Sequence, residues 1–159
     1  MSRQSRTVQQ WFDEYGVSHQ NKTNKLIHWI MVPVIFFTIV GLLWSIPKMD
    51  WMGASPWLNW ATIAMLPAMY FYYTLSKRIL LGMLLFTGLC LVTSYMLTQY
   101  LAMPLWLFSA VLFAIAWVFQ FVGHKIEGAK PSFFEDLQFL LIGPAWLLGF
   151  IYQRIGIRY

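Results

Sequence analysis

The sequence predicts an all-α fold: an integral membrane helical bundle that forms a single domain. Of its 159 residues, 59% are hydrophobic and only 11% are charged, whereas soluble domains carry about a quarter charged residues. The mean hydropathy is +0.58, and long stretches of the chain hold no formal charge. These features indicate that lipid surrounds most of the folded chain and leave no room for a large soluble domain.

Charged residues divide the chain into apolar segments of membrane-spanning length. One helix of about 20 apolar residues crosses roughly 30 Å of hydrocarbon. Residues 26–47 and 57–76 are uncharged, and each segment predicts one crossing. The next uncharged stretch is too long for one crossing and predicts two, over residues 79–99 and 104–124. Pro104 suits the first turn of the last of these helices. The sequence therefore predicts four transmembrane helices.

The two ends of the chain differ from this pattern. Residues 1–25 are polar, with no apolar core and no small-residue cleavage site, so we expect a cytoplasmic segment and not a signal peptide. A last apolar segment, residues 137–153, is interrupted by Gly143 and Pro144. It predicts either a fifth crossing or a short or broken helix packed on the bundle. Residues 1–159 are thus expected to form one membrane-embedded domain.

The distribution of lysine and arginine predicts the orientation and the partners. Basic residues occur in the N-terminal segment, at Lys77 and Arg78, and after His124, so the positive-inside rule places these segments in the cytoplasm. Although the net charge is +5, the basic residues are scattered along the sequence in short loops and at both termini, and we expect the lipid bilayer and no nucleic acid as partner. Cys90 is the only cysteine, which excludes an intrachain disulfide and a cysteine-based metal site. The sequence does not define the oligomeric state.

All three histidines of the chain are predicted to lie at one membrane face. His28 is near the start of the first predicted span and His124 is at the end of the fourth, so an even number of crossings separates them. His19 precedes the first span at the same face. A single histidine near a helix end commonly just bridges lipid headgroups and water, but ionisable side chains that face a membrane bundle are candidates for function. Three histidines at one face point to metal binding. The positive-inside rule predicts that this face, and with it the N-terminus and the metal site, is cytoplasmic.

Helical spacing places polar side chains beside two of these histidines. Asn24 lies four residues before His28, while Gln120 and Glu127 lie four residues before and three residues after His124. The three polar residues are therefore candidates to orient the imidazoles. For Glu127 two alternatives remain open: a direct ligand, as in histidine–carboxylate sites, or a solvated surface carboxylate.

The ligand types leave several metals and functions open. Three histidines suit zinc, iron or copper, and they are too few for the di-iron sites of membrane desaturases and hydroxylases. A single iron with three facial protein ligands keeps positions open for oxygenase chemistry. A redox protein with haem between His28 and His124 is an alternative, and so is a transporter or scaffold without catalysis.

Three motifs of the chain resemble those of one known family. The stretch HQNKTNKLIHWIMVP (residues 19–33) is similar to the family's pattern of His, Asn and Ile-His near Val-Pro. The stretch WVFQFVGHKIEGAKPSFFEDL (residues 117–137) is similar to its block of Gln, Gly-His, Glu and Pro, and LIGPAWLL (residues 141–148) resembles its terminal segment. The resemblance spans nearly the whole chain, the order and spacing of the motifs agree, and the family that the chain resembles is the 2-hydroxy-fatty-acid dioxygenase family.

The resemblance implies an Fe(II)-dependent membrane enzyme of α-oxidation. Its reaction would convert a 2-hydroxy fatty acid and O2 into a fatty acid one carbon shorter and CO2. The residues carried over as catalytic and metal-binding are His19, His28 and His124. Lysines at the same face could attract the substrate carboxylate, although they also anchor membrane proteins; they are Lys25, Lys125 and Lys130. The expected location is the inner membrane in a bacterium or the endoplasmic reticulum in a eukaryote.

Overall fold

The computed structural model of the protein describes residues 6–130 and 138–159, so residues 1–5 of the polar segment and residue 137 of the last apolar segment lie outside the described part. Within it the chain is all-helical, as predicted, with six α-helices, one short 3-10 helix (Asp50–Met52) and no strand. The α-helices are α1 (Val8–Val17), α2 (Lys22–Trp44), α3 (Trp60–Leu75), α4 (Lys77–Tyr100), α5 (Leu105–Glu127) and α6 (Phe139–Arg154).

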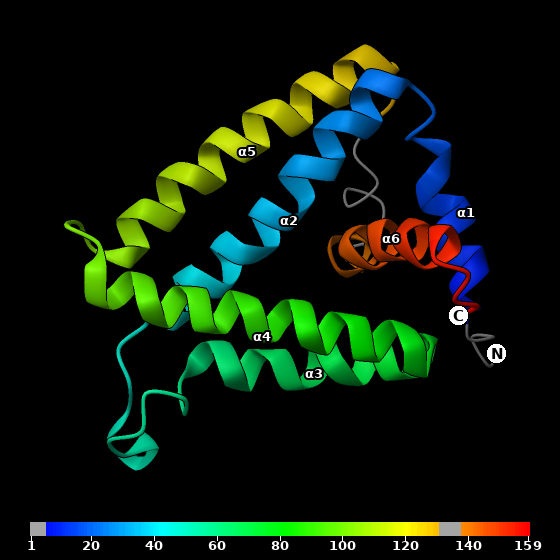
Figure 1. The fold of residues 1–159 in the computed structure, drawn as a ribbon. Helices are drawn as coiled ribbons and strands as arrows, with labels where there is room; N and C mark the ends of the chain where they lie inside the picture. The colour runs from blue at the N-terminus through cyan, green and yellow to red at the C-terminus, as the bar shows by residue number, and fades with distance from the viewer. Residues whose placement is uncertain (1–5, 131–137) are drawn as a thin grey trace, which may run out of the picture.

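Helix α2 is the centre of the arrangement. It packs along α5 in antiparallel fashion, so that the start of α2 and the end of α5 lie together (Figure 1). Helices α3 and α4 form a second hairpin that crosses the other end of α2, and α1 packs on α6. Because α2 contacts α3, α4, α5 and α6, a site near its first turns is surrounded by protein on several sides.

The number of full-length crossings is smaller than predicted. Among the described residues, three helices are long and apolar enough to cross a membrane: α2, α4 and α5. The predicted span 57–76 is the 16-residue helix α3, about 24 Å long. It is short because Asn59 caps its start, accepting hydrogen bonds from the Ala61 and Thr62 amides, and because Ser76 is extended at its end. The prediction of a full-length span over residues 57–76 is therefore wrong.

The C-terminal segment also falls short of a full crossing. Helix α6 has 16 residues and contains Pro144, so it is the short helix among the alternatives and not a fifth full-length span. Its interior side is well buried, with Ile142 and Ala145 at 0% exposure. Since α6 contacts α1, α2 and α4, it closes the bundle beside the first turns of α2.

Helix α1 was not predicted from the polar N-terminal segment. It begins at a capping box in which Thr7 and Gln10 exchange hydrogen bonds. Trp11, Phe12 and Tyr15 are spaced to lie on one helical face and are buried. That spacing was the signal for a helix that packs on the bundle instead of a free cytoplasmic segment.

Two glycines allow α2 and α5 to lie close together. A Cβ atom on Gly41 would collide with Ser109 Oγ, and one on Gly123 would collide with Asn24 Oδ1. Small residues at such positions are typical of closely packed membrane helices. The contact at Gly123 brings the first turns of α2 against the last turns of α5.

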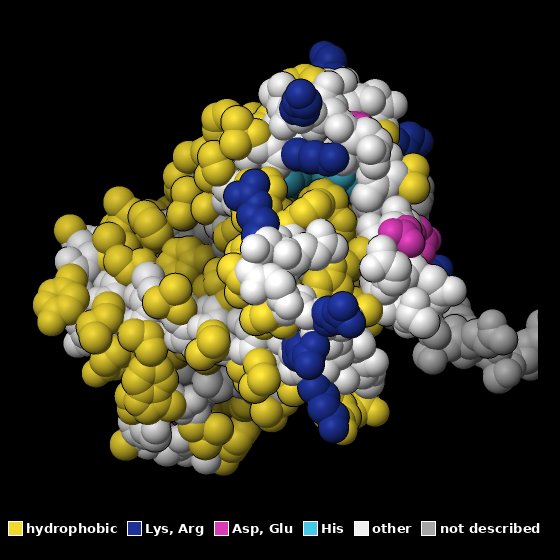
Figure 2. All heavy atoms as spheres, turned by 45° about the vertical axis from the view of Figure 1, so that its right-hand side comes forward, with side chains coloured by type: hydrophobic (Ala, Val, Ile, Leu, Met, Phe, Trp, Pro, Cys, Tyr) yellow, Lys and Arg dark blue, Asp and Glu magenta, His cyan; other side chains and the backbone are white. Residues whose placement is uncertain are grey.

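The surface divides into an apolar and a basic region. Figure 2 shows hydrophobic side chains over one side of the molecule and a band of lysine and arginine side chains over the other, with histidine atoms visible between them near the top. Only 22–33% of the residues in each membrane-length apolar stretch are buried within the protein. The other residues of these stretches are partly or fully exposed on the protein surface, where lipid can contact them.

Candidate metal centre

The structure brings the three histidines together in one buried cluster. His19 lies in the loop between α1 and α2, His28 in the second turn of α2 and His124 in the last turn of α5. Each offers a ring nitrogen, and these three nitrogens lie within 4.8 Å of one another. The side chains are only 1%, 2% and 5% exposed. In the part of the chain that the structure describes, this group has the composition and spacing of a metal site.

The three rings meet edge to face. The ring centroids of His19 and His28 are 4.3 Å apart, those of His19 and His124 5.1 Å, and those of His28 and His124 4.8 Å. The interplanar angles are 82°, 76° and 90°. The three rings are thus nearly perpendicular to one another and close enough for one nitrogen of each to approach a shared point.

Backbone carbonyls fix the tautomer of two histidines. His19 Nδ1 lies 2.6 Å from the Tyr15 carbonyl oxygen, and His28 Nδ1 lies 2.9 Å from the Asn24 carbonyl oxygen. Since a carbonyl oxygen can only accept, each Nδ1 carries the proton and each Nε2 keeps its lone pair. Histidine ligands of metals are commonly oriented in this way.

Several buried polar atoms at the cluster have no hydrogen-bond partner among the described residues. They include His19 Nε2, His124 Nδ1, Asn24 Oδ1 and Gln120 Oε1. An unpaired buried polar atom costs about 1–3 kcal/mol, so a concentration of them calls for an explanation. A metal ion bound by the imidazole nitrogens would satisfy the histidines, and the donor set fits it.

Aromatic side chains pack against His19. The Tyr15 ring stacks on the imidazole with centroids 4.1 Å apart at 16°, and Trp146 of α6 lies 5.4 Å from it. Burial lowers the pKa of His19 to about 4 because the imidazolium would lose its hydration. His19 is therefore neutral at physiological pH, which is the form that binds a metal. Sequence reasoning missed both aromatic residues, although Tyr15 stands one helical turn before His19.

Glu127 joins the end of α5 to the start of α2. Its carboxylate accepts hydrogen bonds from the Gln20 amide (2.7 Å), the Asn21 amide (2.8 Å) and Asn24 Nδ2 (3.0 Å). Both oxygens are thus engaged at the N-terminus of α2, where negative charge is favourable. Glu127 does not belong to the cluster of candidate ligand atoms, so the geometry favours an orienting role over direct ligation.

Asn24 connects the same network to His19. Its Nδ2 donates to Glu127 and also to the Ser18 carbonyl oxygen, 3.1 Å away. Asn24 is fully buried against Gly123. The segments that carry the three histidines are therefore held together by one amide and one carboxylate. Gln120, 4% exposed, also lies near the cluster.

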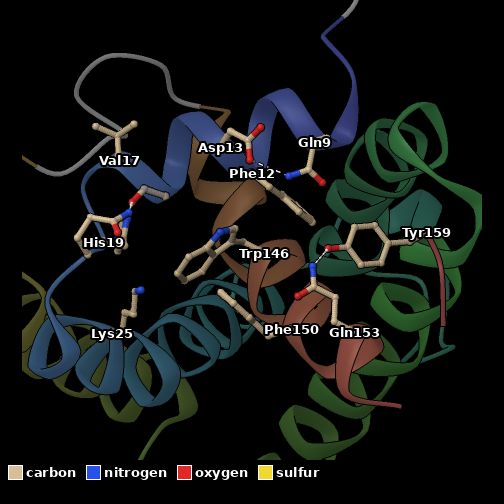
Figure 3. A pocket seen from close by; sticks show the side chains of 12 residues that line it. Gln9, Phe12, Asp13, Val17, His19, Lys25, Trp146, Phe150, Gln153 and Tyr159 are labelled. Atoms are coloured by element: carbon tan, nitrogen blue, oxygen red, sulfur yellow. Dashed lines mark hydrogen bonds between the residues drawn. The ribbon is translucent and has the colours of Figure 1, made fainter. Parts of the chain in front are cut away.

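Two cavities meet at His19. The apolar cavity, about 390 Å³, lies between α2, α3, α5 and α6 and reaches all three histidines. The polar cavity, about 330 Å³, lies between α1, α2 and α6 (Figure 3). Polar side chains that line it include Gln9, Asp13, Gln20, Lys25 and Gln153.

Only one of the three candidate lysines reaches these cavities. Lys25 is half-buried and lines the polar cavity beside His19 (Figure 3). Lys125 and Lys130 are exposed and line neither cavity. Lys25 is thus the lysine that the structure places beside the cluster.

Fold and site together define an all-helical protein with three membrane-length helices and a buried cluster of three histidines near the ends of two of them. The chain belongs to the Mpo1-like family of 2-hydroxy-palmitic acid dioxygenases, whose family model matches residues 5–155. This confirms the family that the motifs indicated. The chain is 28% identical over 144 residues to the 2-hydroxy-palmitic acid dioxygenase MPO1 of Saccharomyces cerevisiae, covering 89% of this chain and 78% of that protein. No solved structure matches the chain.

Proposed function

We propose that this protein is an Fe(II)-dependent dioxygenase that converts 2-hydroxy fatty acids to fatty acids one carbon shorter with release of CO2. The observation that carries the proposal is the buried cluster of His19, His28 and His124, with unpaired ring nitrogens, in a family of dioxygenases. When bound there, Fe(II) would supply the redox reactivity toward O2 and a Lewis acid for the oxygen atoms of the substrate head.

The proposed reaction balances without a further reductant. The bond between C1 and C2 breaks, C1 leaves as CO2, and C2 becomes the carboxyl carbon of the shorter acid. Water is the remaining product. Oxidation of the 2-hydroxy acid releases four electrons, which is the number that full reduction of O2 consumes. The substrate and O2 are therefore sufficient partners.

The residues around the cluster have complementary roles in this proposal. The carbonyls of Tyr15 and Asn24 hold two imidazoles in the required tautomer, and the stacked Tyr15 ring covers one face of the His19 imidazole. Glu127 holds the ends of α5 and α2 together. Lys25 offers a positive charge for the substrate carboxylate in a partly desolvated cavity, where an ion pair is stronger than at the surface.

A site at the end of the membrane helices suits an amphipathic substrate. The apolar cavity runs from the histidines between the helices, while the basic band of Figure 2 lies at the same end. We propose that this end faces the cytoplasm, in accordance with the positive-inside rule. The acid would then approach through the lipid with its head at the basic surface.

The structure gives no support to the haem alternative. A haem between His28 and His124 would need its macrocycle between the two rings. The two ring centroids are only 4.8 Å apart, and the His19 ring lies 4.3 Å and 5.1 Å from them. The space that a porphyrin would occupy is therefore taken by imidazole.

Product analysis tests the proposed function. Protein purified in detergent and loaded with Fe(II) under exclusion of air is given 2-hydroxypalmitate labelled at C1, followed by O2. We expect pentadecanoic acid and labelled CO2 in equal amounts, loss of both with His28→Ala, and retention of both with Glu14→Gln, a substitution of an exposed carboxylate on α1. Absence of the shorter acid from iron-loaded protein would overturn the proposal.

A further inference from the structure

We propose that the apolar cavity binds the acyl chain of the substrate along α2, and that Ile39 and Met65 at its far end determine the preferred chain length. The inference rests on the proposed function and deepens it, because it identifies the part of the site that selects the length of the acyl chain. Its occupant would be an unbranched acyl chain whose 2-hydroxy-acid head lies at the histidines.

The α2 wall of the cavity is a continuous apolar stripe that starts at the cluster. The lining residues of this helix are His28, Val32, Ile35, Phe36 and Ile39. Their spacing of four, three, one and three residues places them on one face of a helix. Beyond His28 none of these side chains can form a hydrogen bond. The stripe therefore offers a path for a hydrocarbon chain but no second binding point for a polar group.

The other walls are apolar except for Gln120 of α5, the indole of Trp117 and Gln138 at the start of α6. Gln120 lies at the histidine end, where it could reach the polar head. Met65 comes from α3, while Phe139, Leu140 and Leu141 come from α6. A histidine cluster at one end and largely apolar walls elsewhere match the division of a fatty acid into head and chain.

The length of the stripe selects the size of the occupant. His28 and Ile39 are eleven residues apart, which is about 16 Å along a helix at 1.5 Å per residue. An extended chain advances about 1.2 Å per bond, as an extended polypeptide does over its three backbone bonds. The stripe thus accommodates roughly 13 carbon–carbon bonds beyond the head. This corresponds to an acid of myristic to palmitic length, and the volume of about 390 Å³ is that of a site for a single small ligand.

Two side chains from different helices close the far end. Ile39 of α2 and Met65 of α3 line the cavity and are half-buried. Ile39 is the α2 lining residue farthest along the helix from His28, and Met65 lines the same cavity from α3, which contacts α2. These two are therefore the side chains that an extended chain would meet last. A smaller residue there should extend the cavity, and a larger one should shorten it. Each additional buried methylene is worth about fourfold in affinity.

Substitution at Ile39 tests the assignment. We would measure kcat/KM of the iron-loaded protein for 2-hydroxy acids from lauric to arachidic length. We expect the wild type to prefer the myristic and palmitic acids, Ile39→Ala and Met65→Ala to shift the preference to longer acids by about fourfold per added methylene, and Ile39→Trp to shift it to the lauric acid. Leu85→Ala on α4, where the side chain is 79% exposed, serves as the control and should leave the profile unchanged.

A binding measurement separates this inference from the proposed function. Unhydroxylated fatty acids of the same lengths would displace a fluorescent fatty acid from the protein without O2. A length preference in binding that moves with Ile39→Trp and Ile39→Ala supports the chain-length assignment even if no acid is converted. If products form but the profiles for turnover and binding of both Ile39 variants match the wild type within twofold, the assignment is wrong while the proposed function stands.

Discussion

Substitution of Glu127 by glutamine should weaken the site without removing any candidate ligand. The carboxylate accepts three hydrogen bonds, two from backbone amides at the start of α2 and one from Asn24. Glutamine has nearly the same shape but only one acceptor oxygen. Its amide nitrogen would face a donor in either orientation: the Gln20 amide at the position of Oε1, or the Asn21 amide and Asn24 Nδ2 at the position of Oε2.

The magnitude follows from the bonds that are lost. Hydrogen bonds to a charged group contribute about 1.5–3 kcal/mol each, and an unpaired N–H near the surface recovers part of this through water. We therefore expect Glu127→Gln to lower the free energy of unfolding by about 2 kcal/mol, or about 4–8 °C in Tm. Because Glu127 and Asn24 align the segments that carry the histidines, iron affinity should fall about 10–100-fold, as for other groups that orient metal ligands.

Thermal unfolding and iron titration of the purified protein measure both effects. Glu14→Gln is a matched control, since Glu14 pairs with Arg6 at 3.3 Å with 42% of each side chain exposed. Such a pair contributes about 0–1 kcal/mol. If Glu127→Gln behaved like Glu14→Gln in both measurements, the role assigned to the carboxylate would be refuted.

Three further predictions follow from the packing and the cavities. Gly123→Ala forces a Cβ atom onto Asn24 Oδ1. It should lower the free energy of unfolding by about 1–3 kcal/mol and cause loss of iron in elemental analysis. As a control, the Cβ atom of Gly88→Ala meets open space, so this variant should be neutral or stabilising in thermal unfolding. Lys25→Met should raise KM for the 2-hydroxy acid about tenfold with little change in kcat, because it removes an ion pair from a partly desolvated cavity. Lys130→Met should leave both constants unchanged. Equal effects of the two substitutions would contradict the assignment of Lys25. Chelation should abolish turnover and lower Tm because the metal binds only the folded chain; Fe(II) should restore both, and Zn(II) only Tm.

The helical class and the histidine cluster could be predicted because they depend on simple properties of the sequence. Hydropathy and the positions of charges define where apolar helices run. Counting the crossings places His28 and His124 at the same face, and the structure holds their ring centroids 4.8 Å apart. The antiparallel contact of α2 and α5 ensures this result even though α3 is shorter than a full crossing.

The features that were missed depend on local capping or on tertiary contacts. Hydropathy did not show that Asn59 would cap α3, so that the helix begins at Trp60, three residues after the predicted start of the span. Charged residues hid the apolar face of α1, and so the stacking of Tyr15 on His19. The partners of Glu127 lie more than 100 residues away, so no local pattern could decide between a ligand and an orienting group.

Elemental analysis of the protein and its single histidine variants tests the central claim most directly. After loading with Fe(II) and removal of excess metal, we predict about one iron per chain in the wild type, as three facial ligands from one chain imply, and in Glu14→Gln. His19→Ala, His28→Ala and His124→Ala should each lose nearly all of it while circular dichroism shows unchanged helix content. Iron retained at the wild-type level in any of the three variants would contradict a site built from these histidines.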